Sequence, residues 1–441
     1  MRWRTHIARA AGVALTVGLA AQLGPEVDRV WTAATAMSPM AASDAKPIFL
    51  TTRAVAGHQD PTDPTIIEAL ATTHRTARNQ FGAHRPTGKG SPFASVYPPS
   101  LPRLLAPVAA DRWSDFLRQW RALGLGAYVL GALAAGAAAS GRGLRPFAAV
   151  AGLAAALWLV PALDTTLALG QANALVAGIL GMSVALLALG PVVLGALTLV
   201  LGGAVKLVPL VLLWPLVVAR RWTALLLAFA LVVLICLASA ENIGLVNFFK
   251  DIGASLEYTS RMSPEWLYGG AHPTPPWLWK LHAIRTVHLG GITALLAGTA
   301  AARVRWHPTR QRELLGGAAA LMCAWLAVLS SPGQLIYAPL LTPALAWLVG
   351  GLIGDLRVRP WMLLLAPLVF VLHAVDFDTP GTVAPAARLM LVAWGIWGAV
   401  AIRVLAILWP TTPRSRRRPL LALAGVASVL FTAWATVDLW A

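Results

Sequence analysis

The sequence predicts an all-α polytopic membrane protein of about 12–13 transmembrane helices with a long first extracytoplasmic loop. Of its 441 residues, 58% are hydrophobic and only 12% are charged, and the mean hydropathy is +0.68. A soluble protein could not cover that much apolar surface with so few polar residues. The apolar residues also form blocks of about 20, the length that crosses the hydrocarbon core as a helix.

The chain is strongly basic, with a formal net charge of +17. The Lys and Arg residues separate the hydrophobic blocks and have no interleaved aromatic residues, so we expect no nucleic-acid partner. They instead fit the positive-inside rule, which places such residues in short cytoplasmic loops. Cys236 and Cys323 lie inside apolar runs and are expected to be free thiols.

The Arg clusters set the direction of each span, because they mark the cytoplasmic side. We expect one integral membrane domain over residues 1–441, with an uncleaved first helix and no internal repeat. Two long external segments are expected at 24–118, with interfacial helices, and at 241–282. The expected spans cover residues 7–23, 120–140, 146–163, 167–188, 222–240, 284–302, 314–330, 336–353, 360–375, 385–407 and 419–438.

Residues 192–218, VVLGALTLVLGGAVKLVPLVLLWPLVV, have to begin and end on the cytoplasmic side, because the basic ARRW segment follows them. One straight helix would end on the wrong side. Gly202, Gly203 and Pro209 interrupt helices. The sequence therefore predicts two short helices that meet near GGAVKLVP, where non-helical backbone is tolerated only if it is buried in protein or lines a cavity.

Polar residues that could take part in a reaction lie at the external side of this arrangement. Asp44 follows the first span, and a single carboxylate at a membrane surface suits a general base that takes a proton from an alcohol. A solvated loop aspartate is the alternative. Lys206 lies between the two half-helices, where a lysine is costly unless it meets an anion or a polar cavity. Its alternatives are snorkelling to the headgroups or pairing with a carboxylate.

Gln171 and Asn173 place two amides in span 167–188, about one turn from its external end. Residues two apart on a helix point to different sides, so we do not expect them to form one clamp. One is expected to hydrogen-bond a neighbouring span, and the other to face the cavity and hold sugar hydroxyls or the break near Lys206; packing alone is the alternative. We expect no metal, because the chain has no DxD pair and its histidines lack ligand spacing, although Asp60 and Asp63 leave a weak site open.

Four segments, in order, resemble the GT-C fold membrane glycosyltransferases that use polyprenyl-phosphate sugars. They are most similar to family 87, which includes bacterial mannosyltransferases acting on glycolipids. The segments are SDAKPIFLTTRAVAGHQDP with Asp44, YPPSLPRLLAP with Tyr97, GQANALVAG, and GGAVKLVPLVLLWPLVVARRW.

The resemblance implies a GT-C-like bundle in the bacterial cytoplasmic membrane, with its active site on the extracytoplasmic side. It implies transfer of a hexose, expected to be mannose, from polyprenyl phosphate to a hydroxyl of a glycolipid or polysaccharide, with inversion. Asp44 would be the general base, and no cofactor or divalent metal is required because the leaving phosphate is a good one. The residues expected to bind the donor phosphate and sugar are Lys206, Arg53, Gln171, Asn173, Tyr97, His272 and Tyr337.

The later half of the chain departs from the family pattern. Family members often have a Ser-Pro stretch with one or two His residues; LSSPGQLIYAPLLTPALAWL has Ser331, Pro332 and Tyr337 but no His. His272, in the second external loop, is the candidate substitute. The alternatives are a lipid or glycolipid flippase, which would be expected to show two similar halves, a relative with a protein acceptor, and a catalytically inactive scaffold.

Overall fold

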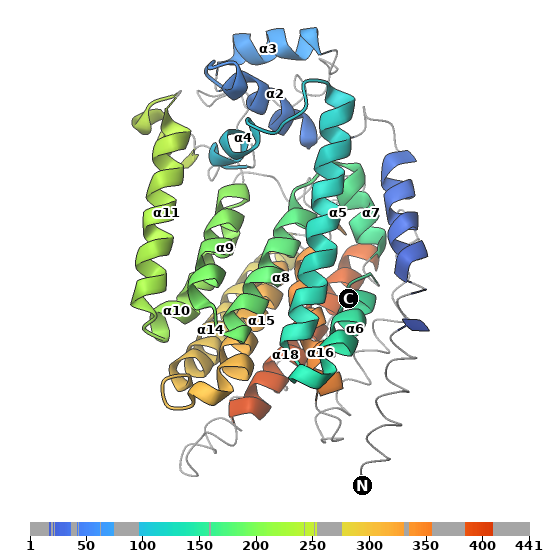
Figure 1. The fold of residues 1–441 in the computed structure, drawn as a ribbon, viewed down its shortest axis with the longest axis vertical. Coiled ribbons are helices and arrows are strands. Elements are labelled where there is room, and N and C mark those ends of the chain that lie inside the picture. The colour runs from blue at the N-terminus through green and yellow to red at the C-terminus, as the bar shows by residue number, and fades with distance from the viewer. Residues whose placement is uncertain are drawn as a thin grey trace.

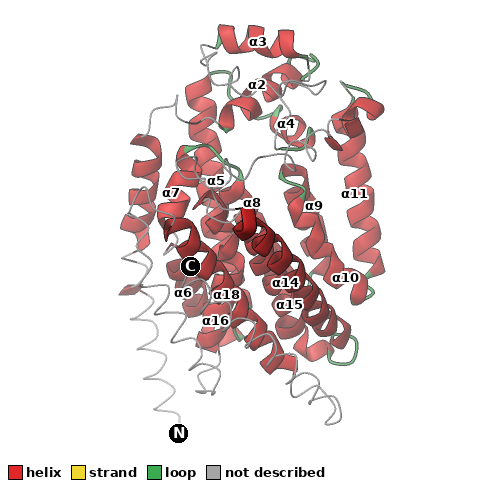
Figure 2. Cartoon of the chain, turned by 180° about the vertical axis from the view of Figure 1, so that it is seen from behind, coloured by secondary structure: helices red, strands yellow, loops and turns green. Residues whose placement is uncertain are grey.

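The computed structural model describes residues 17–18, 21, 23–36, 42, 44–61, 63–74, 97–157, 160–241, 243–250, 252–253, 276–329, 335–354 and 384–408. The regular secondary structure of these residues is helical, and they contain no strand (Figure 2). The expected all-α class is therefore confirmed. The spans expected at 360–375 and 419–438 lie outside the described residues, as does most of the span expected at 7–23.

Residues 23–36 are helical. The labelled α-helices are α2 (Ala45–Ala56), α3 (Pro64–Thr73), α4 (Ser100–Leu105), α5 (Trp113–Ala138), α6 (Arg145–Leu157), α7 (Val160–Ala168), α8 (Asn173–Leu189), α9 (Val192–Val205), α10 (Trp214–Val218), α11 (Trp222–Ala240), α14 (Pro276–Arg303), α15 (Gln311–Leu329), α16 (Thr342–Gly354) and α18 (Ala384–Leu408). Short 3₁₀ helices are η4 (Arg142–Leu144), η5 (Val208–Leu213), η6 (Pro308–Arg310) and η7 (Leu335–Leu341).

The long helices form a bundle, and α2, α3 and α4 lie across one end of it (Figure 1). Helices α5 and α8 approach closely because glycines meet at their contact. A Cβ atom built on Gly131 would lie 2.6 Å from the Cα atom of Gly178. One built on Gly181 would lie 2.6 Å from the carbonyl carbon of Gly131. The two backbones therefore touch, which is the packing that small residues allow in membrane helices.

Helix α9 and the η5–α10 segment form a hairpin. The residues that flank the hairpin in the chain, Leu187 and Arg221, both bind the Gln311 side chain. The Gln311 amide nitrogen donates to the Leu187 carbonyl oxygen at 3.3 Å, and its amide oxygen accepts from the Arg221 guanidinium at 3.1 Å. At its tip, the Ser100 hydroxyl donates to the Ala204 carbonyl at 2.8 Å. The chain thus runs to the end that α4 covers and returns, and the predicted pair of short helices is confirmed.

The short basic connections gather at the end of the bundle opposite α2–α4 (Figure 1). Besides the Arg221–Gln311 bond, Arg312 donates to the Ser140 carbonyl at 2.7 Å, and Arg305 donates to the Val218 carbonyl. The arginines of these described short connections therefore share one end, as the charge pattern predicts.

Two described helices, α5 and α11, are long and apolar enough to cross a membrane. Helix α11 leaves large apolar side chains exposed, including Leu226, Phe229 and Leu234. Such a face suits contact with lipid. The total number of spans stays a prediction.

Several boundaries differ from the sequence prediction. Helix α5 begins at Trp113 and α14 at Pro276, each inside an external segment expected from the sequence, at 24–118 and 241–282 respectively. Residues 23–36, at the start of the first of these segments, are helical. The span expected at 167–188 is interrupted: α7 ends at Ala168 and α8 begins at Asn173. Gly170 in the break has φ +71°, and a Cβ atom there would collide with Ala45. This left-handed backbone ends the helix, so Gln171 precedes α8 rather than lying inside it.

Candidate active site

Asp44 immediately precedes α2 and faces the break between α7 and α8. Its backbone N–H donates to the Leu169 carbonyl at 3.1 Å, and its side chain makes no capping hydrogen bond to α2. The Gln171 amide nitrogen instead donates to its Oδ2 atom. Both the backbone and the carboxylate of Asp44 are therefore held by the residues of one turn.

Tyr97 sets the orientation of the Gln171 amide. The backbone N–H of Ala172 donates to the Tyr97 hydroxyl at 3.2 Å, and this hydroxyl donates to the Gln171 Oε1 atom at 3.1 Å. Because the Gln171 oxygen accepts from Tyr97, its NH₂ group is left to face the carboxylate. The Tyr-Pro-Pro segment thus acts on Asp44 through Gln171.

Lys206 lies at the tip of the hairpin. It follows α9 in an extended conformation, with φ −155° and ψ 127°, and only 9% of its surface is exposed. Its ammonium donates to the Oδ1 atom of Asn173 at 2.9 Å, and Asn173 is fully buried. The negative charge of Asp44 also acts on this ammonium. A buried, hydrogen-bonded Lys206 does not fit the alternative in which it snorkels to the headgroups.

The two amides serve different charged groups. Gln171 binds the carboxylate of Asp44, and Asn173 binds the ammonium of Lys206. They do not form one clamp, as expected, and one of them does bind the break near Lys206. One short segment therefore connects an acid, which can take a proton, with a cation, which can stabilise negative charge.

The other candidate residues lie elsewhere. Arg53 is nine residues beyond Asp44, about 13 Å along α2, and forms an ion pair with the exposed Asp111. His272 lies outside the described residues. Tyr337 belongs to η7, but the position of its side chain is not described.

The acidic residues of the first loop have structural contacts. The Asp63 carboxylate accepts from the backbone N–H of Thr65 at 2.8 Å and from its hydroxyl at 2.7 Å. These hydrogen bonds, the hydroxyl's first, lower the pKa of Asp63. Asp63 therefore serves as the N-cap of α3. Within the described part of the chain, no group of three His, Cys, Asp or Glu residues could hold a metal ion.

Sequence reasoning missed two residues beside this site. On α5, the Trp120 indole N–H donates to the Gly170 carbonyl at 2.9 Å. The neighbouring Arg121 donates to the carbonyls of Leu167 at 2.9 Å and Ala168 at 2.8 Å. The available signal was an arginine inside an otherwise apolar span, which is costly without partners.

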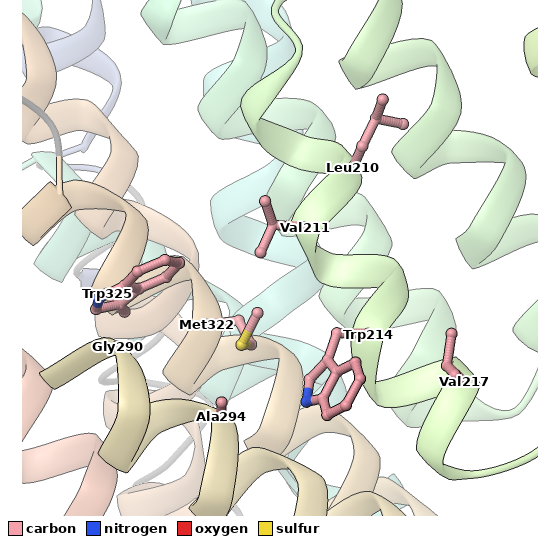
Figure 3. A pocket seen from close by; sticks show the side chains of 8 residues that line it. All are labelled: Leu210, Val211, Trp214, Val217, Gly290, Ala294, Met322 and Trp325. Atoms are coloured by element: carbon pink, nitrogen blue, oxygen red, sulfur yellow. The ribbon is translucent and has the colours of Figure 1, made fainter. Parts of the chain in front are cut away.

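An apolar groove of about 450 Å³ begins one turn after Lys206 (Figure 3). Helix segment η5–α10 forms one wall, and α14 and α15 form the other. The lining residues are Leu210, Val211, Trp214, Val217, Gly290, Ala294, Met322 and Trp325. The groove has the chemistry to accept a hydrocarbon chain rather than a sugar.

Comparison with known proteins identifies one family. The sequence profile of glycosyltransferase family 87 matches residues 96–332, which is more than half of the chain. The match contains Tyr97, Gln171, Asn173 and Lys206, and it begins after Asp44. No curated protein and no solved structure shows a significant match.

Proposed function

Because the chain belongs to glycosyltransferase family 87, whose members are membrane proteins, we propose that it transfers mannose from a polyprenyl phosphate to a hydroxyl group of a glycolipid or polysaccharide. The observation that supports this proposal most directly is the juxtaposition of Asp44 and Lys206. Gln171 and Asn173, two residues apart, bind these two groups respectively.

Asp44 acts as the general base. Its carboxylate takes the proton of the acceptor hydroxyl as that oxygen forms a bond to the anomeric carbon of the sugar. The bond between the anomeric carbon and the phosphate oxygen breaks at the same time, on the opposite face, so the configuration inverts. Gln171 orients the carboxylate by binding its Oδ2 atom.

Lys206 stabilises the leaving group. The departing polyprenyl phosphate gains negative charge in the transition state, and a fixed cation beside it favours that state over the bound donor. The hydrogen bond to Asn173 and the placement between α9 and η5 hold the ammonium in position without solvent around it. A divalent metal is not required for this step, because the phosphate is already a good leaving group.

The groove beside η5–α10 supports a lipid-linked donor. The first lining residue, Leu210, follows Lys206 by four residues, so a hydrocarbon chain in the groove would end near the lysine. A donor with its phosphate at Lys206 and its polyprenyl chain along η5–α10 would satisfy both features.

The charge distribution supports an extracytoplasmic site. The described short connections that are rich in arginine lie at the end of the bundle opposite α2, and the positive-inside rule assigns that end to the cytoplasm. We therefore place the enzyme in the bacterial cytoplasmic membrane as a multi-pass protein, with Asp44 at the outer surface.

The experiment is transfer from radiolabelled polyprenyl-phosphate mannose in liposomes that contain the purified protein and a membrane glycolipid extract as acceptor. We expect Asp44→Asn to lower the rate by about 10²–10⁴-fold, the usual contribution of a general base. Asp63→Asn is the matched control, since asparagine also caps helices, and it should keep wild-type activity. Lys206→Met should impair use of the donor more than use of the acceptor. Full activity in Asp44→Asn would remove the base from the mechanism.

A further inference from the structure

We infer that Trp120 and Arg121 are positioning residues that hold the Asp44 carboxylate in its reactive place, an inference that rests on the proposed function. Both residues are on α5 and are buried, with 5% and 4% of their surfaces exposed. Their side chains donate hydrogen bonds to the end of α7, at Leu167 and Ala168, and to Gly170 in the turn that follows it.

The same turn holds Asp44 from its other side. Leu169, between the carbonyls that α5 binds, accepts the backbone N–H of Asp44 at 3.1 Å. Gly170 packs so tightly on Ala45 that a side chain would not fit. Gln171 follows directly and binds the carboxylate. The turn therefore lies between α5 and the start of α2, and its position sets the position of Asp44.

Arginine is well suited to fix such a turn. The last carbonyls of a helix have no partner within it, and a guanidinium is a planar fork that can bind two of them at once. Its charge is also favoured at the negative end of the helix dipole. An arginine in an apolar span is costly without such partners, so an apolar residue at position 121 would be the simpler choice for packing alone.

The expected consequence of losing these bonds is a slower reaction rather than weaker binding. Displacement of a catalytic group by about 1 Å can reduce a rate about 10²-fold. Loosening the turn shifts Gln171 and hence the carboxylate. Asn173 already belongs to α8 and keeps its hydrogen bond to Lys206, and the groove is formed by other helices. The rate constant kcat should fall, and the KM for the donor should stay near its wild-type value.

The chain offers a matched pair of substitutions for the test. Trp113 and Trp120 both stack on Phe116, with ring centroids 6.3 and 6.2 Å away. Among the described residues, the indole nitrogen of Trp113 has no hydrogen-bond partner. Trp120→Phe and Trp113→Phe therefore remove similar volume from one aromatic stack, but only Trp120→Phe removes a hydrogen bond to the turn. We expect Trp120→Phe to lower kcat about tenfold and Trp113→Phe to change it less than twofold.

A double-mutant cycle separates positioning from simple stabilisation. If Trp120 acts through Gln171, Trp120→Phe should cause little further loss of kcat in the Gln171→Ala background. Arg121→Lys, which keeps the charge but loses the fork, should give the same pattern and serves as the second variant. The positioning role would be overturned by equal losses of kcat with and without Gln171, or by wild-type kcat in both Trp120→Phe and Arg121→Lys. If Asp44→Asn were inactive in the same assay, the proposed function would still stand. An active Asp44→Asn would overturn the proposed function itself.

Discussion

Substitution of Gly131 by alanine should push α5 and α8 apart. A Cβ atom at this position would lie 2.6 Å from the Cα atom of Gly178 and 2.8 Å from its carbonyl carbon. Carbon atoms in favourable contact are about 3.5–4.0 Å apart, so the helices have to separate by about 1 Å. The obstacle is backbone, which cannot rotate away as a side chain can.

The magnitude follows from two opposing contributions. Overpacking a well-packed core costs about 1–3 kcal/mol, and a backbone clash belongs at the upper end of that range. Alanine in place of glycine favours the helix by about 0.8–1.0 kcal/mol. The expected net loss is therefore about 2 kcal/mol of unfolding free energy. Because α5 holds the turn before α8, activity should fall as well.

Thermal unfolding in detergent micelles measures this effect, with the buried thiol of Cys323 as the reporter that becomes reactive when the bundle opens. Gly126→Ala is the matched control, because it lies on the same helix and a Cβ atom there would meet nothing within 4 Å. We expect Gly131→Ala to unfold at a lower temperature than wild type, and Gly126→Ala at the same temperature or a higher one. Equal midpoints for the two variants would refute the close-contact reasoning.

Two further predictions concern the loop end of the bundle. Burial, and secondarily the positive charge of Arg53, lowers the pKa of His74 below its ordinary value of 6.5, so the fold favours neutral His74 and loses stability as the pH falls below about 6.5. His74→Phe, which retains an aromatic ring against Phe49, should show a smaller loss of stability between about pH 7 and 5; an unchanged pH dependence would contradict this assignment. Gly170→Ala should lower kcat at least about tenfold, because alanine at positive φ costs about 1–2 kcal/mol and its methyl group would displace Ala45; wild-type turnover in this variant would show that the turn tolerates the shift.

The positions of the helices were largely predictable from composition and charge. The span expected at 222–240 coincides with α11, because an uninterrupted apolar block between basic and polar residues defines both of its ends. The hairpin at 192–218 was predictable on two grounds. The basic residues that follow it require both of its ends to lie on the cytoplasmic side, and residues that break helices lie near its middle. Neither prediction needed information about neighbouring helices.

The break between α7 and α8 was not predictable in the same way. Hydrophobicity continues through Leu169 and Gly170, so a single helix over 167–188 was the natural interpretation. The break is fixed by contacts from elsewhere in the chain, namely the close approach of Ala45 and the hydrogen bonds from α5. A hydropathy pattern contains no information on such contacts.

The candidate site shows the same division. Residue chemistry and the family resemblance singled out Asp44, Lys206, Gln171 and Asn173, but not which amide binds which charged group. That pairing depends on the backbone of the turn. Arg53 was grouped with them because it follows Asp44 closely in sequence, yet the length of α2 separates the two. Its part in donor binding stays a prediction.

The α9–α10 hairpin has a consequence for how the chain can change over time. The hairpin begins and ends at the same end of the bundle, so it does not change the direction of the helices that follow it. A single straight helix over the same residues would reverse the direction of those helices. Removal of the whole hairpin would cost the groove and Lys206 but would leave the direction of the later described helices unchanged, whereas its straightening would reverse that direction. Gly202 and Gly203 allow Pro209 and Leu210 to pack against them, which closes the hairpin. These two glycines therefore help to set the direction in which the later described helices cross the bundle.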